Sequence, residues 1–200
     1  MDIWQIERDY RAQGLSFICG VDEAGRGPLA GPVCAAACIL PEGAELPGLN
    51  DSKKLSEKQR EALYPLITAS ALCWAVCMVD ERVIDEINIL QATFRAMRGA
   101  VSQLKITPEL CLVDGNRDPG LGLPTRTIVK GDSQCACVAA ASILAKVTRD
   151  RYMVELDARF PGYGFAVHKG YGTKAHYEAL DRLGISPVHR RTFLKKYEHS

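Results

Sequence analysis

Residues 20–28, Gly-Val-Asp-Glu-Ala-Gly-Arg-Gly-Pro, place two adjacent carboxylates at the end of an apolar strand and follow them at once with a Gly-Arg-Gly turn. Asp22 and Glu23 are neighbouring negative charges that repel each other and resist burial unless a cation lies between them. Glycine lacks a Cβ and adopts positive φ, so the turn can bring backbone N–H groups close to a phosphate or a sugar. The stretch therefore indicates a hard metal ion beside a phosphate, as nucleotide chemistry requires.

The composition is that of an ordinary globular protein. Of 200 residues, 47% are hydrophobic and 24% are charged, which suffices for one core and argues against wholesale disorder. We expect a single domain over residues 1–200, with a polar lead-in segment over residues 1–16 and a basic helical part over residues 161–200. This last part holds seven Lys or Arg, three Asp or Glu and all four histidines. Its charge suits phosphate binding, although such a face is often only solvated.

The eight cysteines lie almost entirely within apolar runs and form no CxxC pair. We expect them to be small buried hydrophobic residues, not disulfide partners or metal ligands. Together with an N-terminus that has no secretory signal, they predict a reducing, cytoplasmic location. The cysteines are Cys19, Cys34, Cys38, Cys73, Cys77, Cys111, Cys135 and Cys137.

One run, residues 62–79, contains 18 residues without a charge, the length at which a membrane-spanning helix is considered. Pro65, Thr68 and Ser70 interrupt this run, and its second half has the β-branched and aromatic character of a strand. We therefore expect the end of a helix followed by a buried strand, with no membrane segment.

Apolar runs and helical periodicity predict an α/β fold, a mixed five-stranded sheet flanked by helices and followed by additional C-terminal helices. Ser56 is expected to be the N-cap of a helix that precedes the third strand. The expected strands are 17–21, 33–40, 72–79, 110–113 and 125–129, and the expected long helices are 88–104 and 133–159.

Carboxylates follow three of the expected strands: Asp22 and Glu23 follow the first, Asp114 the fourth and Asp132 the fifth. Functional sites of open α/β sheets gather at strand ends, so these acids meet if their strands are neighbours. Mg²⁺ and Mn²⁺ prefer oxygen ligands. Two ions about 4 Å apart would use three or four carboxylates, one ion activating a water and the other stabilising the leaving oxygen of a phosphodiester. The acids thus predict phosphodiester hydrolysis.

The residues alone leave plainer interpretations open. Successive side chains of a strand point to opposite faces, so Asp22 and Glu23 share a site only if the backbone departs from strand geometry, which Gly25 makes easy. Otherwise the acid pair simply faces solvent. Asp132 is equally suited to be the N-cap of the helix that begins at Ser133.

A zinc site and a Cys-His nucleophile are the competing chemistries. The histidines lack HExxH spacing, and no pair of cysteines supports them as zinc ligands. Cysteines embedded in apolar segments also disfavour a thiolate. The histidines concerned are His168, His176, His189 and His199.

Two further segments, residues 51–54 and 168–173, are of the polar, cationic or Gly-containing type that contacts phosphates and sugars. Lys53 supplies a positive charge in the first. In the second, Tyr171 lies between two glycines and offers a flat face to a sugar or a base. Either segment can equally be an ordinary exposed loop.

Six motifs in the same order resemble the bacterial ribonuclease HII family, and the match extends over roughly residues 18–192. The motifs are 22–28 (Asp-Glu-Ala-Gly-Arg-Gly-Pro), 50–56 (Asn-Asp-Ser-Lys-Lys-Leu-Ser), 113–116 (Val-Asp-Gly-Asn), 130–133 (Lys-Gly-Asp-Ser), 140–147 (Ala-Ala-Ser-Ile-Leu-Ala-Lys-Val) and 168–173 (His-Lys-Gly-Tyr-Gly-Thr). The resemblance implies a ribonuclease H-like fold and an endonuclease that cuts the RNA strand of RNA–DNA hybrids and incises at single ribonucleotides embedded in duplex DNA. It implies products with 5′-phosphate and 3′-hydroxyl ends.

The resemblance also implies roles for individual residues. Four carboxylates, Asp22, Glu23, Asp114 and Asp132, would bind Mn²⁺ or Mg²⁺, with Asp132 the least secure ligand. The turn of residues 25–27 would contact the ribonucleotide around its 2′-hydroxyl. The substrate-binding residues implied are Gly25, Arg26, Gly27, Lys53 and Tyr171, with Tyr171 packing on the adjoining deoxyribose.

The related ribonuclease HIII family usually carries Gly-Thr-Gly in this turn and an extra N-terminal domain, whereas this chain has Arg26. We expect a monomer that acts on RNA–DNA hybrid and on ribonucleotide-containing duplex DNA, without a membrane or an evident protein partner. The alternatives are a non-catalytic nucleic-acid-binding module and a different nuclease on the same fold.

Overall fold

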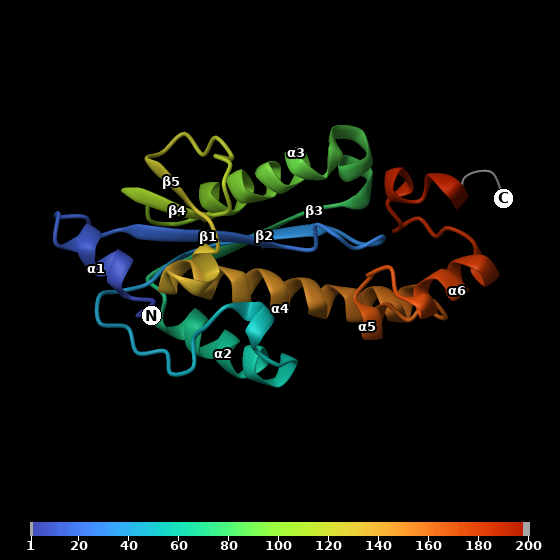
Figure 1. Cartoon of the computed structure of the whole chain (residues 1–200), viewed down its shortest axis with the longest axis horizontal. Coiled ribbons are helices and arrows are strands. Elements are labelled where there is room, and N and C mark those ends of the chain that lie inside the picture. Colours follow the sequence, from blue (N-terminus) through green and yellow to red (C-terminus); the bar gives the residue numbers. More distant parts are fainter. Residues whose placement is uncertain (1, 198–200) are drawn as a thin grey trace.

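The computed structural model describes residues 2–197 and has a five-stranded sheet between layers of helices (Figure 1). The strand order is β3-β2-β1-β4-β5, with β2 antiparallel to both of its neighbours and β1, β4 and β5 mutually parallel. The strands are β1 (Ile18–Ala24), β2 (Val33–Ile39), β3 (Cys73–Val79), β4 (Leu110–Asp114) and β5 (Thr125–Ile128). The mixed sheet expected from the sequence is confirmed.

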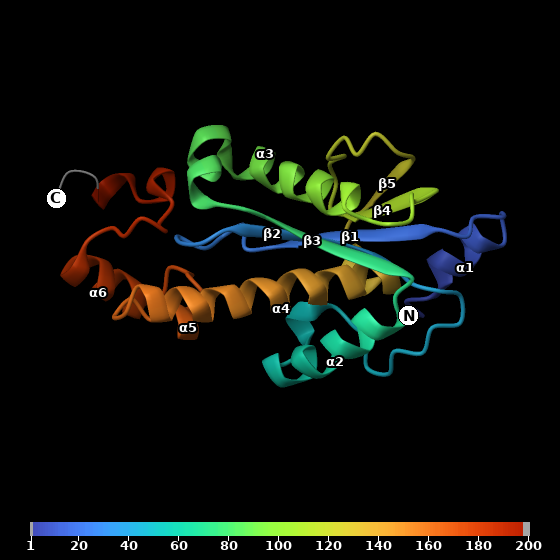
Figure 2. The same ribbon diagram turned by 180° about the vertical axis from the view of Figure 1, so that it is seen from behind.

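Helices cover both faces of the sheet, as the two opposite views show (Figures 1 and 2). One face carries α3, and the other carries α4 and α2. The helices are α1 (Gln5–Arg11), α2 (Glu57–Ser70), α3 (Glu81–Ser102), α4 (Ala136–Arg159), α5 (Phe165–His168) and α6 (Lys174–Leu183). Short 3-10 turns are η1 (Ser52–Lys54), η2 (Gly131–Ser133), η3 (Arg191–Phe193) and η4 (Lys195–Tyr197).

Successive side chains of β1 point alternately to the two faces of the sheet, and so they contribute to the cores under both helical layers. Ile18 packs in the cluster on the α4 side, whereas Cys19 and Val21 pack in the cluster on the α3 side. Gly20 faces α4, where a Cβ would overlap the backbone of Cys137. The absence of a side chain at Gly20 therefore lets the central strand and the long helix approach closely.

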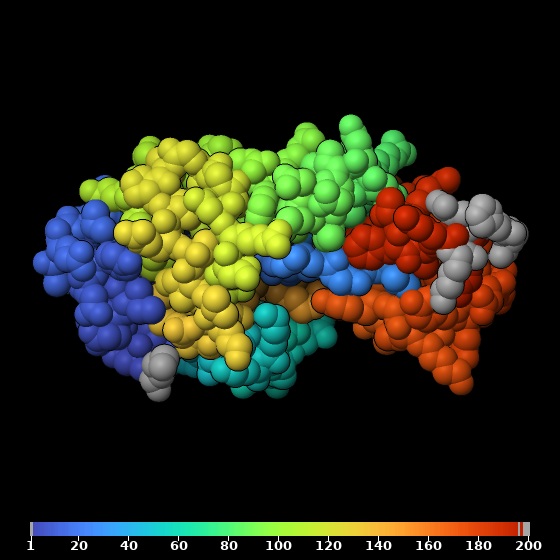
Figure 3. All heavy atoms as spheres, turned by 45° about the horizontal axis from the view of Figure 1, so that its top comes forward, coloured from blue at the N-terminus to red at the C-terminus, as the bar shows by residue number. Residues whose placement is uncertain are grey.

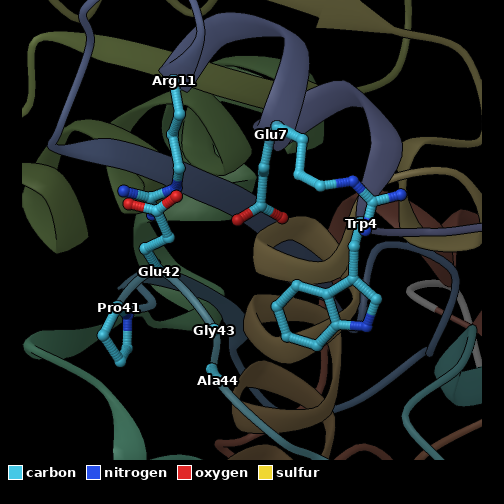
Figure 4. Close-up of a pocket in the computed structure, with 8 residues that line it drawn as sticks. Trp4, Glu7, Arg11, Pro41, Glu42, Gly43 and Ala44 are labelled. Atoms are coloured by element: carbon cyan, nitrogen blue, oxygen red, sulfur yellow. The ribbon is translucent and has the colours of Figure 1, made fainter.

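The N-terminal segment closes the start of α4. The N-cap residue of α4, Cys135, makes no side-chain cap. Instead, the carboxylate of Glu7 in α1 accepts a hydrogen bond from the Cys137 amide at 2.7 Å, and the carbonyl of Ile3 accepts one from Ala136 at 2.8 Å. Figure 4 shows the Glu7 side chain directed from α1 toward the end of α4. The N-terminal segment thus satisfies amides that the helix itself leaves unpaired.

Two sequence expectations need correction here. The helix expected from residue 133 begins at Ala136, so Asp132 lies in η2 and does not cap α4. The helix expected from residue 88 is the second segment of α3, where the Asn88 side chain accepts from the amides of Leu90 and Gln91. A first segment, not expected, begins at Glu81, where Asp80 caps it through the Val83 amide. Near residue 88 this helix has a kink, with Asn88 at a φ of 68°.

Other expectations hold. Ser56 and Gln59 form a capping box at the start of α2. Residues 62–79 are the rest of α2 followed by β3, and no helix in the described part of the chain is long and apolar enough to cross a membrane. All eight cysteines are free, and only Cys77 is not fully buried.

Candidate active site

The acids at the ends of β1 and β4 are brought together by the sheet. The two strands are parallel neighbours, and the pairing of Val21 with Val113 places Asp22 beside Asp114. Asp22, Glu23 and Asp114 all line one cavity of about 210 Å³. Figure 3 shows a hollow between the cyan segment that contains η1 and the blue strands, with the brown part of α4 at its floor.

The acid pair keeps regular strand geometry. Pairing with β2 continues through Ala24, and the backbone leaves the strand only at Gly25, where φ is 92°. Asp22 and Glu23 therefore lie on opposite faces. Both still line the cavity, and Glu23 also borders a second cavity of about 330 Å³ beside α3.

Asp114 and Asp132 are held by neighbouring backbone and side chains. The Asp114 carboxylate accepts a hydrogen bond from the Gly131 amide at 2.7 Å, which ties the end of β4 to η2. Asp132 is buried, and its carboxylate lies 3.4 Å from the Lys53 ammonium. Asp132 is not among the residues that line the cavity shared by the other three acids.

The electrostatics of the site are those of acids held close together. Burial, followed by the charges of Glu23 and Asp114, raises the pKa of Asp22 well above its ordinary value. Burial also raises the pKa values of Glu23 and Asp132, and the charge of Asp114 adds to both shifts. Within residues 2–197, however, no three such side chains are close enough to form a ready-made metal cage.

Two buried arginines lie against the Gly-Arg-Gly turn and the residues that follow it, and sequence reasoning missed both. Arg190 donates to the carbonyls of Gly25, Arg26 and Gly31 at 2.6, 2.9 and 2.9 Å. Arg149 from α4 donates to the carbonyls of residues 30, 32 and 169 at 2.9 to 3.2 Å. A Cβ on Gly25 would overlap the Arg149 side chain, so this glycine is required by contact as well as by φ.

The arginine contacts orient the amides of the turn. In a trans peptide the carbonyl and the N–H point in opposite directions. Because Arg190 binds the carbonyls of Gly25 and Arg26, the N–H groups of Arg26 and Gly27 point away from Arg190. Residues 25–27 also line the cavity that holds the acids. Arg149 lies among charged and polar residues and Arg190 is followed by Arg191, so the sequence does not single out either arginine.

Lysines flank the same cavity. Lys53 is carried by η1, which the hydrogen bond between the Ser52 and Ser142 hydroxyls, at 2.6 Å, fastens to α4. Burial alone would lower the pKa of Lys53, but the surrounding acids, Asp132 first, raise it. Lys146 of α4 pairs with Asp150 at 2.7 Å and also lines the cavity, although sequence reasoning did not select it.

Tyr171 lies at the rim of the cavity on the side of the glycine turn. Its ring is partly exposed, and a Cβ built on Gly27 would lie 3.7 Å from Tyr171 Cε1. The Lys146 ammonium lies 6.0 Å from the centre of the ring. The structure therefore places the tyrosine, the glycine turn and the acids around one space.

Comparison with known proteins agrees with this arrangement. The Ribonuclease HII family profile matches residues 19–196. The chain belongs to the ribonuclease HII family. Ribonuclease HII from Geobacter metallireducens is 56% identical over 197 residues, which are 98% of this chain and 92% of that protein. As a family member at this identity, the chain is a ribonuclease H endonuclease.

Solved structures give the same assignment of fold. The crystal structure of ribonuclease H2 from Pyrococcus horikoshii OT3 superposes with a TM-score of 0.78 at 31% identity and covers 92% of this chain and 97% of that one. Bst-RNase HIII, solved in complex with Mn²⁺, superposes with a TM-score of 0.63 at 20% identity and covers 94% of this chain and 73% of that one. The second likeness concerns the fold alone.

Proposed function

We propose that this ribonuclease HII cuts the RNA strand of RNA–DNA hybrids and also incises duplex DNA at single embedded ribonucleotides, leaving 5′-phosphate and 3′-hydroxyl ends. The observation that carries the proposal is the shared cavity, in which three carboxylates lie beside the glycine turn and Tyr171. The carboxylates suit the hydrolysis of a phosphodiester, and the turn suits recognition of a sugar.

The donor set fits a hard divalent cation, Mn²⁺ or Mg²⁺. Asp22, Glu23 and Asp114 offer only oxygen atoms, and a bound cation would offset the burial and the neighbouring negative charges that raise the pKa of Asp22. We assign these three as ligands, with Asp132, which does not line the cavity, as a fourth. When bound, two such ions activate a water and stabilise the leaving oxygen.

The chain's own groups would bind and orient the substrate. The outward N–H groups of Arg26 and Gly27 would donate to the ribose around its 2′-hydroxyl, the group that distinguishes RNA from DNA. Tyr171 would pack on the deoxyribose that follows the ribonucleotide. Lys53 would approach a backbone phosphate of the duplex.

We further propose that the protein acts as a cytoplasmic monomer with one catalytic domain. Free, mostly buried cysteines suit a reducing compartment. The central sheet and its helical layers share two continuous core clusters, which suits a single folding unit.

The test is cleavage of four matched substrates with Mg²⁺ or Mn²⁺: a DNA duplex with one ribonucleotide, a uniform RNA–DNA hybrid, an all-DNA duplex and an all-DNA junction. We expect cutting of the first two only. An intact ribonucleotide-containing duplex under all conditions would contradict the proposal. Metal-insensitive binding without cutting would indicate a binding module, and cutting of the all-DNA junction would indicate a different nuclease.

A further inference from the structure

Three histidines that the catalytic proposal does not use lie together behind Tyr171. His168, His176 and His189 are buried and come from α5, α6 and the segment that follows α6. The rings of His168 and His176 stack with centres 4.3 Å apart, and His176 Nε2 lies 3.0 Å from His189 Nε2. The ring of Phe165 contacts all three imidazoles. An apolar setting of this kind favours neutral imidazole.

Backbone groups fix the proton positions in His189 and His176. The Ser186 amide donates to His189 Nδ1 at 3.0 Å, so Nδ1 carries a lone pair and the proton is on Nε2. His189 Nε2 then donates to His176 Nε2, which leaves the His176 proton on Nδ1. There it donates to the carbonyl of Tyr171 at 2.9 Å. Only this pair of tautomers satisfies both ends of the chain of hydrogen bonds.

His168 supports the same loop with its own fixed tautomer. The Gly170 amide donates to His168 Nδ1 at 3.1 Å, so His168 Nε2 carries the proton and donates to the carbonyl of Tyr163 at 2.7 Å. The His168 carbonyl accepts from the Tyr171 amide at 2.9 Å. Tyr171 is thus held through its N–H by His168 and through its carbonyl by His176.

The histidine chain also connects Tyr171 to the glycine turn. His189 forms an isolated β-bridge with Ala30, two residues after Pro28, and Leu29 donates to the Gly170 carbonyl at 2.8 Å. The adjacent residue, Arg190, holds the turn itself. One segment of the chain therefore sets the positions of both the turn and the tyrosine.

We propose that His176 and His189 are positioning residues that fix Tyr171 through its carbonyl, and that selectivity for the ribonucleotide–deoxyribonucleotide junction requires this neutral pair. The inference rests on the proposed role of Tyr171 at the junction. A second proton on His176 would set two donors against each other at the two Nε2 atoms and would break the contact between the two rings.

The first test compares cleavage of the single-ribonucleotide duplex with cleavage of the uniform hybrid. We expect His176→Phe, which keeps a flat ring but removes the donor, to reduce the ratio of the two kcat/KM values about tenfold, the scale of one hydrogen bond. His176→Asn can place an amide N–H near the Nδ1 position and should recover most of the ratio. Leu180→Ala in the same helix controls for lost stability and should leave the ratio unchanged.

Two outcomes of this comparison would overturn the inference. One is an equal loss on both substrates in His176→Phe, since that would indicate a purely structural role. The other is a loss of the ratio in Leu180→Ala as large as that in His176→Phe.

The second test measures the imidazole tautomers of the substrate-free protein by ¹⁵N NMR. We expect the proton on Nδ1 of His176 and on Nε2 of His189 and His168 at neutral pH. A His176 proton on Nε2, or doubly protonated rings, would contradict the proposed hydrogen bonds from His189 through His176 to Tyr171. This measurement needs no cleavage. A wild-type protein that cuts neither duplex would therefore refute the proposed function, while the tautomers would still test the hydrogen bonds from His189 through His176 to Tyr171.

Discussion

At the scale of single residues, the site depends on carboxylates whose charge, and not only whose shape, is needed. Asp114→Asn keeps an oxygen that can accept from the Gly131 amide at its present distance of 2.7 Å, but removes the negative charge. We expect cleavage to fall by at least about a hundredfold, with thermal stability retained, because a neutral amide is a poor ligand for a hard cation.

The matched control for this substitution is Asp9→Asn, an exposed acid of α1. It removes the same charge without touching the cavity and should leave the cleavage rate unchanged. If Asp114→Asn cuts as fast as Asp9→Asn, the acid at the end of β4 has no catalytic role.

Substitution of Gly25 by Ala tests the close contact between this glycine and Arg149. Gly25→Ala adds a Cβ at positive φ that also overlaps the Arg149 side chain, whereas Gly43→Ala adds one at a φ of 72° with nothing within 4 Å. We expect Gly43→Ala to lose about 1 kcal/mol of unfolding free energy and Gly25→Ala to lose at least about 2 kcal/mol more. Chemical denaturation measures both. Equal losses would mean that only φ matters at Gly25.

At the scale of elements, α1 stabilises α4 through one buried carboxylate. Glu7→Ala removes the acceptor of the Cys137 amide and should lower the unfolding free energy by about 2–3 kcal/mol. Glu7→Gln keeps an acceptor oxygen and should lose less. Glu42→Ala, an exposed acid of the same pocket (Figure 4), is the control and should lose little. A loss in Glu42→Ala equal to that in Glu7→Ala would contradict the capping role.

The sequence predicted the elements well where apolar periodicity and turn chemistry agreed. Strands β2 to β5 lie at their expected positions, whereas β1 continues to Ala24 and includes the two acids expected to follow it. Ser56 caps α2 through the expected motif. The start of α4 was misplaced because its cap comes from Glu7, 130 residues away, and not from a local side chain. Local sequence carries no signal for a cap of that kind.

The site was predictable only in part, for a related reason. Adjacent acids and glycines in residues 22–27 are a local pattern that sequence reasoning can find. Arg190 binds that stretch from 164 and 165 residues away through the carbonyls of Arg26 and Gly25, and no residue type reveals a carbonyl acceptor. Arg149 lies against Gly25. The histidine pair was set aside because sequence spacing does not report that His176 and His189 meet in space.

At the scale of the whole molecule, the buried histidines predict how stability depends on pH. Burial, and then His176, lowers the pKa of His189 to about 4 from the ordinary 6.5, and Ser186 and His168 are its other neighbours. The unfolded chain therefore takes up this proton at higher pH than the folded protein. The stabilisation is complete above about pH 6.5 and is lost as the pH falls toward about 4.

We expect this one group to change the unfolding free energy by about 3 kcal/mol across that window. The measurement is chemical denaturation at several pH values for the wild type and for His189→Asn, in which Asn can still accept from the Ser186 amide. The unfolding free energy of His189→Asn should depend less steeply on pH than that of the wild type. Identical slopes in the two proteins would contradict the neutral, buried state of His189.

The central claim concerns the molecule as an assembled site, in which acids from two parallel strands share divalent cations. Crystals grown with Mn²⁺ and measured by anomalous diffraction test it most directly. The account predicts an anomalous peak inside the cavity, bound by Asp22, Glu23 and Asp114. Manganese bound only elsewhere, with these three carboxylates free of it, would contradict the account.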